Sequence, residues 1–228
     1  MVALVGWFAS WRALDRRYDS SWLLRLYGFT WLQAHGQLPE LRARLDTWAE
    51  AVAAQIAQTP ADEVLIVGHS TGSMLAVELA ARLRAGAAQD ETFPGGSIAL
   101  LTLGHCVPIL ASFPAAQGFR QAIAEVADWS GLTWHDVSAP RDWAAFARTP
   151  PWQGCAGRAR LAQYSPRFHR TLDAAAYQAL VRDQAALHLQ YLRAPRVAGG
   201  YDPVVWMAGP LRLSERHRTP SRPGGRLS

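Results

Sequence analysis

The sequence predicts an α/β fold in which a mostly parallel sheet is flanked by helices. Two short apolar runs, residues 64–67 and 97–103, are typical of strands that are buried on both faces, as in a parallel sheet. Around them, apolar residues recur at three- and four-residue steps, which is the spacing of one helix face. Strands that alternate with amphipathic helices form βαβ units, and these units build a sheet with helices on its faces.

The predicted elements follow one another after an aromatic-rich opening. A helical stripe of apolar residues begins near Pro39, and Pro60 ends it. The elements expected beyond it are, in chain order, a strand over 64–67, a helix over 72–86, a strand over 97–103, a helix over 115–128, strands over 132–138 and 160–165, a long helix over 173–192 and a final strand over 204–208.

The chain divides into three segments by composition. Residues 1–38 form an aromatic-rich helical N-terminal segment, residues 39–213 one α/β domain, and residues 214–228 a disordered basic tail rich in Arg, Pro, Gly and Ser. Within the first segment, residues 21–32 have two interpretations. They pack as a buried helix, or they lie at a lipid interface.

Composition narrows the class of protein. Of 228 residues, 50% are hydrophobic and 18% charged, as in an ordered globular chain. The 23 cationic residues are all Arg and are dispersed, so we expect no nucleic-acid partner. Cys106 and Cys155 form no C-x-x-C pair, and we predict neither a metal site nor a disulfide. A reducing compartment follows, so we expect a cytoplasmic protein without a signal peptide, with membrane association as the alternative.

One motif carries chemistry. Residues 68–72 read Gly-His-Ser-Thr-Gly, a G-x-S-x-G pattern that follows the strand at 64–67 and opens a helix. This setting predicts a sharp, strained turn that lifts the Oγ atom of Ser70 above the sheet edge. Gly68 and Gly72 are expected to let neighbouring backbone approach the turn. The backbone N–H of Thr71 would be one oxyanion donor at the helix N-terminus, whereas an ordinary glycine-rich turn is the alternative.

This turn and the alternation of strands and helices resemble the α/β-hydrolase family of esterases, lipases and thioesterases. The resemblance covers residues 39–192. Three later segments, LLTLGHCVPIL, SPRFH and LHLQYL, are similar to a little-characterised bacterial branch of that family. The family implies that the catalytic acid and then the histidine follow the serine in the chain.

The carboxylate that the resemblance implies is Asp142. It follows the strand at 132–138 across a short loop, where a carboxylate can orient an imidazole. Asp136 lies within the predicted strand, and Asp128 lies at a helix end, so both are weaker candidates. An N-cap for the residues after 142 is the competing role for Asp142.

Two histidines are candidates for the base. His169 follows the strand at 160–165 and precedes the long helix, which is the place that the family implies, so we prefer it. His188 is the alternate base, because a histidine inside a helix reaches a sheet edge less easily. His69 is expected to point away from the serine and to pack beneath the turn.

The sequence departs from the family pattern at the second oxyanion donor. The resemblance places it in a loop after an early strand, and the early candidate here, Val5-Gly6-Trp7, matches poorly. We therefore expect that the first strands of the fold are missing from this chain. Loss of one oxyanion donor costs about 10²–10³-fold in rate.

The resemblance implies a serine hydrolase that cleaves a carboxylic ester or thioester through an acyl-enzyme on Ser70. The apolar opening segment suggests an apolar acyl group, and so a small-molecule ester or a lipid-like substrate. No cofactor is implied. The alternative is a non-catalytic protein of this fold that binds a ligand or contacts a membrane peripherally.

Overall fold

A computed structural model describes residues 6–7, 10–12, 14–15, 20–86, 97–155, 157–198 and 200–218. The first five residues and the last ten lie outside the described part. The predicted tail at 214–228 is therefore described only up to residue 218.

Four parallel strands form the sheet, in the order β1-β2-β3-β4. They are β1 (Glu63–His69), β2 (Ser97–Leu103), β3 (Thr133–Val137) and β4 (Arg160–Tyr164). The register pairs His69 with Leu103 and Leu103 with Val137, so the carboxyl ends of the first three strands lie side by side. The predicted α/β class with a parallel sheet is confirmed, and each of the four strands overlaps a strand expected from the sequence.

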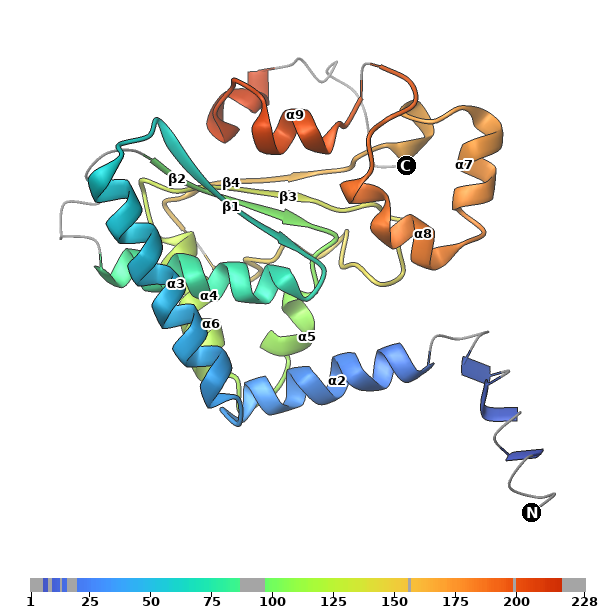
Figure 1. The fold of residues 1–228 in the computed structure, drawn as a ribbon, viewed down its shortest axis with the longest axis horizontal. Helices are drawn as coiled ribbons and strands as arrows, with labels where there is room; N and C mark the ends of the chain where they lie inside the picture. The colour runs from blue at the N-terminus through green and yellow to red at the C-terminus, as the bar shows by residue number, and fades with distance from the viewer. Residues whose placement is uncertain are drawn as a thin grey trace.

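Helices cover both faces of the sheet (Figure 1). On one face lie α3 (Pro39–Gln58), α4 (Gly72–Gly86), α5 (Val107–Ala111) and α6 (Gln117–Ala127); on the other lie α7 (Ala174–Leu180), α8 (Gln184–Leu189) and α9 (Pro203–Ala208). Alternate residues of β2 belong to two separate hydrophobic cores. Leu100 packs in the core beneath α4, whereas Leu101 and Leu103 pack in the core that contains Leu187 of α8. A strand buried on both faces explains the continuous apolar run.

Two predictions about the C-terminal third were wrong, and helix capping explains both. The single helix expected over 173–192 is split into α7, α8 and the short 3-10 helix η2 (Gln190–Leu192). Asp183 begins α8 by accepting a hydrogen bond from Ala186 N at 2.9 Å. The strand expected over 204–208 is α9, where the Asp202 carboxylate accepts bonds from two backbone N–H groups and Pro203 occupies the first turn.

The aromatic-rich segment contains α2 (Ser20–Ala34), which runs along one side of the molecule (Figure 1). Its buried side chains, Leu26 and Thr30, face the body of the protein. No helix in the described ranges is long and apolar enough to cross a bilayer. Near the C-terminus, a hydrogen bond connects η3 (Leu213–Arg218) to β1. The backbone N–H of Leu213 donates to the carboxylate of Glu63 at 2.9 Å.

Candidate active site

Ser70 lies on a sharp turn between β1 and α4. Its φ angle of 56° is in the left-handed region, which a residue with a side chain rarely adopts. The backbone N–H of Ser70 donates to the carbonyl oxygen of Leu103 at 3.0 Å, so the turn is held at the carboxyl edge of the sheet. This is the strained conformation that the G-x-S-x-G motif predicted.

The two glycines of the motif have different roles. A Cβ atom on Gly68 would lie 2.6 Å from the carbonyl oxygen of Gly72 and 2.7 Å from the Cα atom of Ser73. Strand β1 and helix α4 can therefore approach this closely only with glycine at position 68. A Cβ atom on Gly72 would meet nothing within 4 Å. The prediction that glycine is needed for close backbone approach is therefore confirmed at position 68 and wrong at position 72.

Ser73 connects the turn to the segment that follows β2. Its hydroxyl donates to the carbonyl oxygen of Ser70 at 2.5 Å and accepts from Cys106 N at 3.1 Å. Ser73 is fully buried. Ser73 therefore stabilises the strained backbone of Ser70 through these two hydrogen bonds. The sequence analysis missed this role, although Ser73 directly follows the motif.

The structure brings Ser70, His188 and Asp142 into one chain of hydrogen bonds. The Nε2 atom of His188 lies 2.8 Å from Ser70 Oγ, and its Nδ1 atom lies 2.8 Å from Asp142 Oδ2. Asp142 follows β3 in a loop, and His188 lies on α8. The Asp142 side chain is fully buried and that of His188 is 9% exposed, so the hydrogen bond between them is shielded from water.

His169, the preferred base in the sequence analysis, does not take this position. It lies on η1 (Phe168–Arg170), where its ring packs edge-on against Tyr177. The reason lies in the split of the predicted long helix. Because Asp183 begins a separate helix, α8 reaches the carboxyl edge of the sheet, and His188 near its end meets the serine. The geometry favours the alternate histidine.

Asp142 combines both of the roles considered for it. Its Oδ1 atom accepts a hydrogen bond from Ala144 N at 3.1 Å, as a capping aspartate does, while Oδ2 faces His188. The other carboxylates are engaged elsewhere. Asp128 pairs with Arg158, and Asp136 accepts hydrogen bonds from three side chains: Thr102, Ser138 and Gln163.

Tyr191 joins the loop that carries Asp142 to the segment that carries His188. Its phenol oxygen accepts from Ala139 N at 2.8 Å, and Tyr191 follows His188 by three residues. Its ring lies against Gly104, where a Cβ atom would be 2.7 Å from the ring. Tyr191 is fully buried, so it fixes the acid loop and the histidine relative to each other.

One backbone N–H group at the turn has no acceptor among the described residues. It belongs to Thr71, which lies next to Ser70 at the start of α4. The early candidate for the second donor, Val5-Gly6-Trp7, falls partly outside the described residues. Gly6 and Trp7 are helical and exposed, and so do not form the loop after a strand that the resemblance implied.

A comparison with known families adds to this geometry. A family model of the thioesterase domain matches residues 4–91, which include the Ser70 turn and the helix α3 before it. The thioesterase domain is an α/β-hydrolase-type family, so the match supports an assignment of this chain to the α/β-hydrolases. The match supports an ester or thioester hydrolase of this type. Neither a search of curated proteins nor a search of solved structures found a significant match.

Aromatic side chains border the Ser70 site. The Trp22 ring, from α2, lies edge-on to His188 and to Trp143, with ring centroids 6.0 Å apart in both cases. Trp22 and Trp143 are partly exposed. The Sγ atom of Cys106 lies 3.8 Å from Ser70 Oγ, and burial raises the pKa of this thiol to about 11. Cys106 is therefore a neutral thiol beside Ser70.

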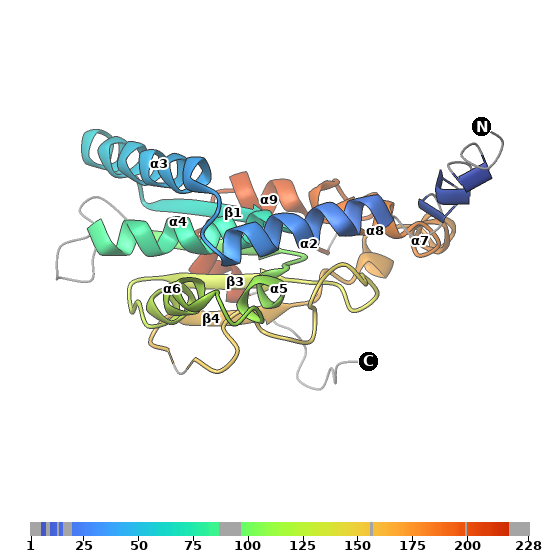
Figure 2. The same cartoon turned by 90° about the horizontal axis from the view of Figure 1, so that it is seen from below.

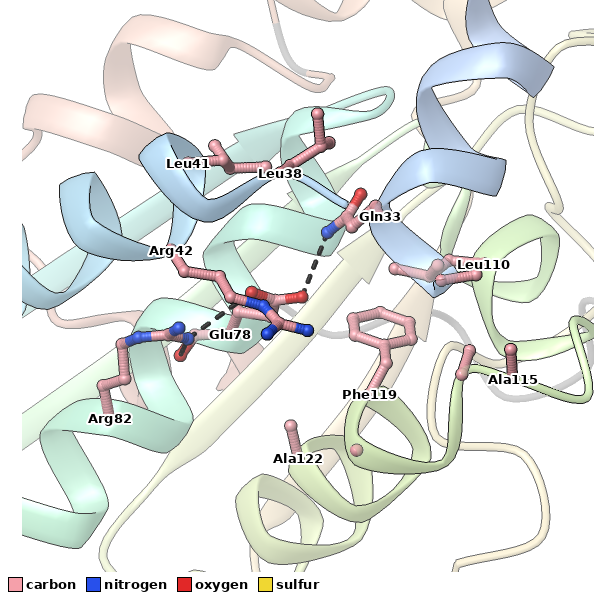
Figure 3. Close-up of a pocket in the computed structure, with 13 residues that line it drawn as sticks. Gln33, Leu38, Leu41, Arg42, Glu78, Arg82, Leu110, Ala115, Phe119 and Ala122 are labelled. Atoms are coloured by element: carbon pink, nitrogen blue, oxygen red, sulfur yellow. Dashed lines mark hydrogen bonds and ion pairs between the residues drawn. The ribbon is translucent and has the colours of Figure 1, made fainter. Parts of the chain in front are cut away.

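A pocket of about 250 Å³ lies away from this site, between α2, α3, α4 and α6 (Figure 3). Gln33 and Glu78 are hydrogen-bonded in it, and Phe119 forms part of its wall. Ser70, His188 and Asp142 do not line it. Within the described ranges, no group of three or more His, Cys, Asp or Glu side chains is arranged to hold a metal ion.

Proposed function

We propose that this chain is a serine hydrolase that cleaves an ester or thioester with an apolar acyl group through an acyl-enzyme on Ser70. The observation that carries the proposal is the continuous hydrogen-bond chain from Asp142 through His188 to Ser70, with both distances at 2.8 Å. A nucleophile, a base and a group that orients the base are the parts that acyl transfer needs.

The roles follow from the direction of the hydrogen bonds. The Nδ1–H of His188 donates to Asp142, so Nε2 is free to accept the hydroxyl proton of Ser70 as Oγ attacks the acyl carbon. His188 then delivers this proton to the leaving alcohol or thiol. Water, activated by the same imidazole, attacks the acyl-enzyme and releases the acid.

The negative charge of the tetrahedral intermediate needs donors in fixed positions. The N–H of Thr71 is one such donor, because it lies at the N-terminus of α4 and has no acceptor among the described residues. The positive end of the α4 dipole adds to this stabilisation.

The apolar acyl group is inferred from the walls of the site. The rings of Trp22 and Trp143 pack edge to face, and the Trp22 ring also lies edge-on to His188. The neutral thiol of Cys106 is a second side chain in contact with Ser70. Flat aromatic surfaces of this kind bind hydrocarbon better than charged groups.

The test is active-site labelling with a fluorophosphonate probe, together with hydrolysis of p-nitrophenyl esters of increasing chain length. We expect the protein to take up label, Ser70→Ala to take up none, and the exposed variant Ser112→Ala to label like the parent. Turnover is expected to rise with chain length and to fall by about 10⁶-fold in Ser70→Ala.

The same experiment separates the proposal from its alternative, a non-catalytic protein that uses the fold for binding. A folded parent that takes up no label and turns over no ester would overturn the hydrolase. In that case Ser70 is not activated, whatever its distance from His188.

A further inference from the structure

The acid loop, residues 138–149, carries Asp142 from the carboxyl end of β3 toward α8 (Figure 1 and Figure 2). Hydrogen bonds hold this loop where it leaves the sheet. Ser138 N donates to the carbonyl oxygen of Tyr164 at 2.9 Å, and the Ser138 hydroxyl donates to the Asp136 carboxylate at 3.2 Å. The far end of the loop belongs to no strand, so its position depends on other contacts.

His105, which follows β2, holds that far end. Its Nε2 atom lies 2.9 Å from the carbonyl oxygen of Thr149, and its own carbonyl oxygen accepts from Phe146 N at 3.1 Å. Because a carbonyl oxygen only accepts, Nε2 carries the proton of this bond. The next residue, Cys106, donates from Sγ to the carbonyl oxygen of Ala144 at 3.3 Å. These contacts hold the far half of the acid loop against the carboxyl end of β2.

We propose that His105 is a positioning residue for Asp142: its side chain fixes the acid loop so that the Asp142 carboxylate meets His188. This role rests on the proposed function, because it concerns how the same site is held in place. The His105 ring is fully buried, so it touches no substrate and acts only through the loop. Asp142 lies between the two ends that are held, and its Oδ2 atom lies 2.8 Å from His188 Nδ1. A displacement of about 1 Å in such a group costs up to about 10²-fold in rate.

Asp136 brings the two ends of the acid loop to one place in the core. Its carboxylate accepts from Ser138 at the start of the loop, and its Oδ2 atom lies 3.7 Å from the Nε2 atom of His105, which holds the end. Asp136 also accepts from Thr102 on β2 and Gln163 on β4, so the carboxylate is fixed by the strands on either side. The start and the end of the acid loop are therefore held by side chains that lie next to each other.

Fold stability alone does not explain a histidine at position 105. The Nδ1 atom of His105 is buried and has no hydrogen-bond partner among the described residues. A buried polar atom without a partner lowers the stability of a fold, and an apolar ring of similar size would avoid this loss. Such a ring would lack the Nε2–H group that reaches Thr149. What the histidine adds is therefore the hydrogen bond that fixes the loop.

The test is a matched pair of amides at position 105. In His105→Gln the amide N–H can lie where Nε2 lies and donate to Thr149, whereas the shorter side chain of His105→Asn places its amide near Nδ1. We expect kcat on a p-nitrophenyl ester to fall by about 10–10²-fold in His105→Asn with KM unchanged, and to stay within about threefold in His105→Gln. Ile56→Ala, in the buried face of α3, is the control: its Tm should fall and its kcat should not.

A double-mutant cycle separates positioning from a general structural defect. Asp142→Asn is expected to lower kcat by about 10⁴-fold. If His105 acts through Asp142, adding His105→Asn to Asp142→Asn lowers kcat by no more than about twofold further. A further loss of about 10–10²-fold would overturn the proposal, because the two residues would then act independently.

A spectroscopic measurement reads the position of Asp142 without turnover. The Nδ1 proton of His188, donated to Asp142, should give a far-downfield ¹H NMR resonance that is absent in His188→Gln. We expect the parent and His105→Gln to show this resonance and His105→Asn to lose it. His105→Phe, which keeps a ring and lacks the donor, should lose it too and replaces the Asn variant if that one does not fold.

Two results of this measurement would overturn the proposal. In the first, the resonance is unchanged in the folded variants that lack the donor. In the second, the parent has no such resonance, so there is no hydrogen bond to position. Fluorophosphonate labelling of the parent is read separately. A parent that shows the resonance and takes up no label overturns the hydrolase, and the resonance in the variants then decides the role of His105.

Discussion

The Nε2 atom of His69 donates a hydrogen bond to the backbone carbonyl oxygen of His188, 2.8 Å away and 119 residues later in the chain. The two imidazole rings lie 4.9 Å apart. His69 was expected to pack beneath the turn, and instead it holds the backbone of the helix that presents the histidine facing Ser70. In the mechanism that we propose, a neutral His69 also avoids placing a second positive charge beside the imidazolium that would form at His188.

The pH dependence of stability tests this relationship. Burial lowers the pKa of His69 from its ordinary value of 6.5. Below this pH the unfolded chain binds a proton that the folded protein resists, so stability is lost as the pH falls from about 6.5 toward the lowered pKa. His69→Gln keeps an N–H donor and removes the titration. We expect its Tm to fall less than that of the parent between about pH 7.5 and pH 5.5. Parallel curves for the two proteins would refute this role.

The two glycines of the motif provide a matched pair. Gly68→Ala forces a Cβ atom against the backbone of α4, and we expect a loss of about 1–3 kcal/mol in the free energy of unfolding. Gly72→Ala meets open space, and its effect should stay within about 0.5 kcal/mol. Urea denaturation measures both. Equal losses would show that the turn is not as tightly packed as the structure describes.

The choice of histidine is tested by a second matched pair. His188→Ala removes the group that faces Ser70, and kcat should fall by about 10⁴-fold or more. His169→Ala removes a ring that packs on Tyr177, and kcat should stay within about threefold of the parent, since exposed changes of this kind are small. A large loss of kcat in His169→Ala and a small one in His188→Ala would instead identify His169 as the base, as we preferred from the sequence. Steady-state kinetics on one p-nitrophenyl ester are sufficient.

Tyr191 is a positioning residue, and its hydroxyl can be removed alone. Tyr191→Phe leaves the N–H of Ala139 buried without its acceptor, which costs about 1–3 kcal/mol. Because the acid loop is released, we expect kcat to fall by about 10–10²-fold while KM stays unchanged. Tyr201→Phe is the control. Its hydroxyl donates to the carbonyl oxygen of Tyr191 and does not contact the acid loop, so stability should fall and kcat should not. If the two variants lose kcat equally, Tyr191 acts only through general stability.

The prediction of the strands and of the nucleophile turn needed only local patterns. The runs at 64–67 and 97–103 are apolar throughout because β1 and β2 lie between two layers of helices, and burial on both faces leaves a continuous signal in the sequence. The Ser70 turn, where φ is 56°, was predictable because the strand, the motif and the helix are contiguous in the sequence.

The helices after β4 were less predictable, because short-range capping outweighs periodicity. Residues 173–192 show the stripe of one long helix, but Asp183 accepts from Ala186 N and begins a new helix there. Residues 204–208 are β-branched and apolar, yet Asp202 and Pro203 begin a helix. Aspartate before an apolar run was the signal that could have found both.

The sequence by itself determined the α/β class, the four parallel strands, Ser70 on its turn and Asp142 in the loop after β3. Only the tertiary structure decided which histidine meets the serine, that His69 and Tyr191 support it, and that Gly68 rather than Gly72 is sterically required. The physical reason is distance along the chain. His188 reaches Ser70 across 118 residues because of the way α8 packs on the sheet edge, and this packing is the sum of many contacts that no local pattern contains.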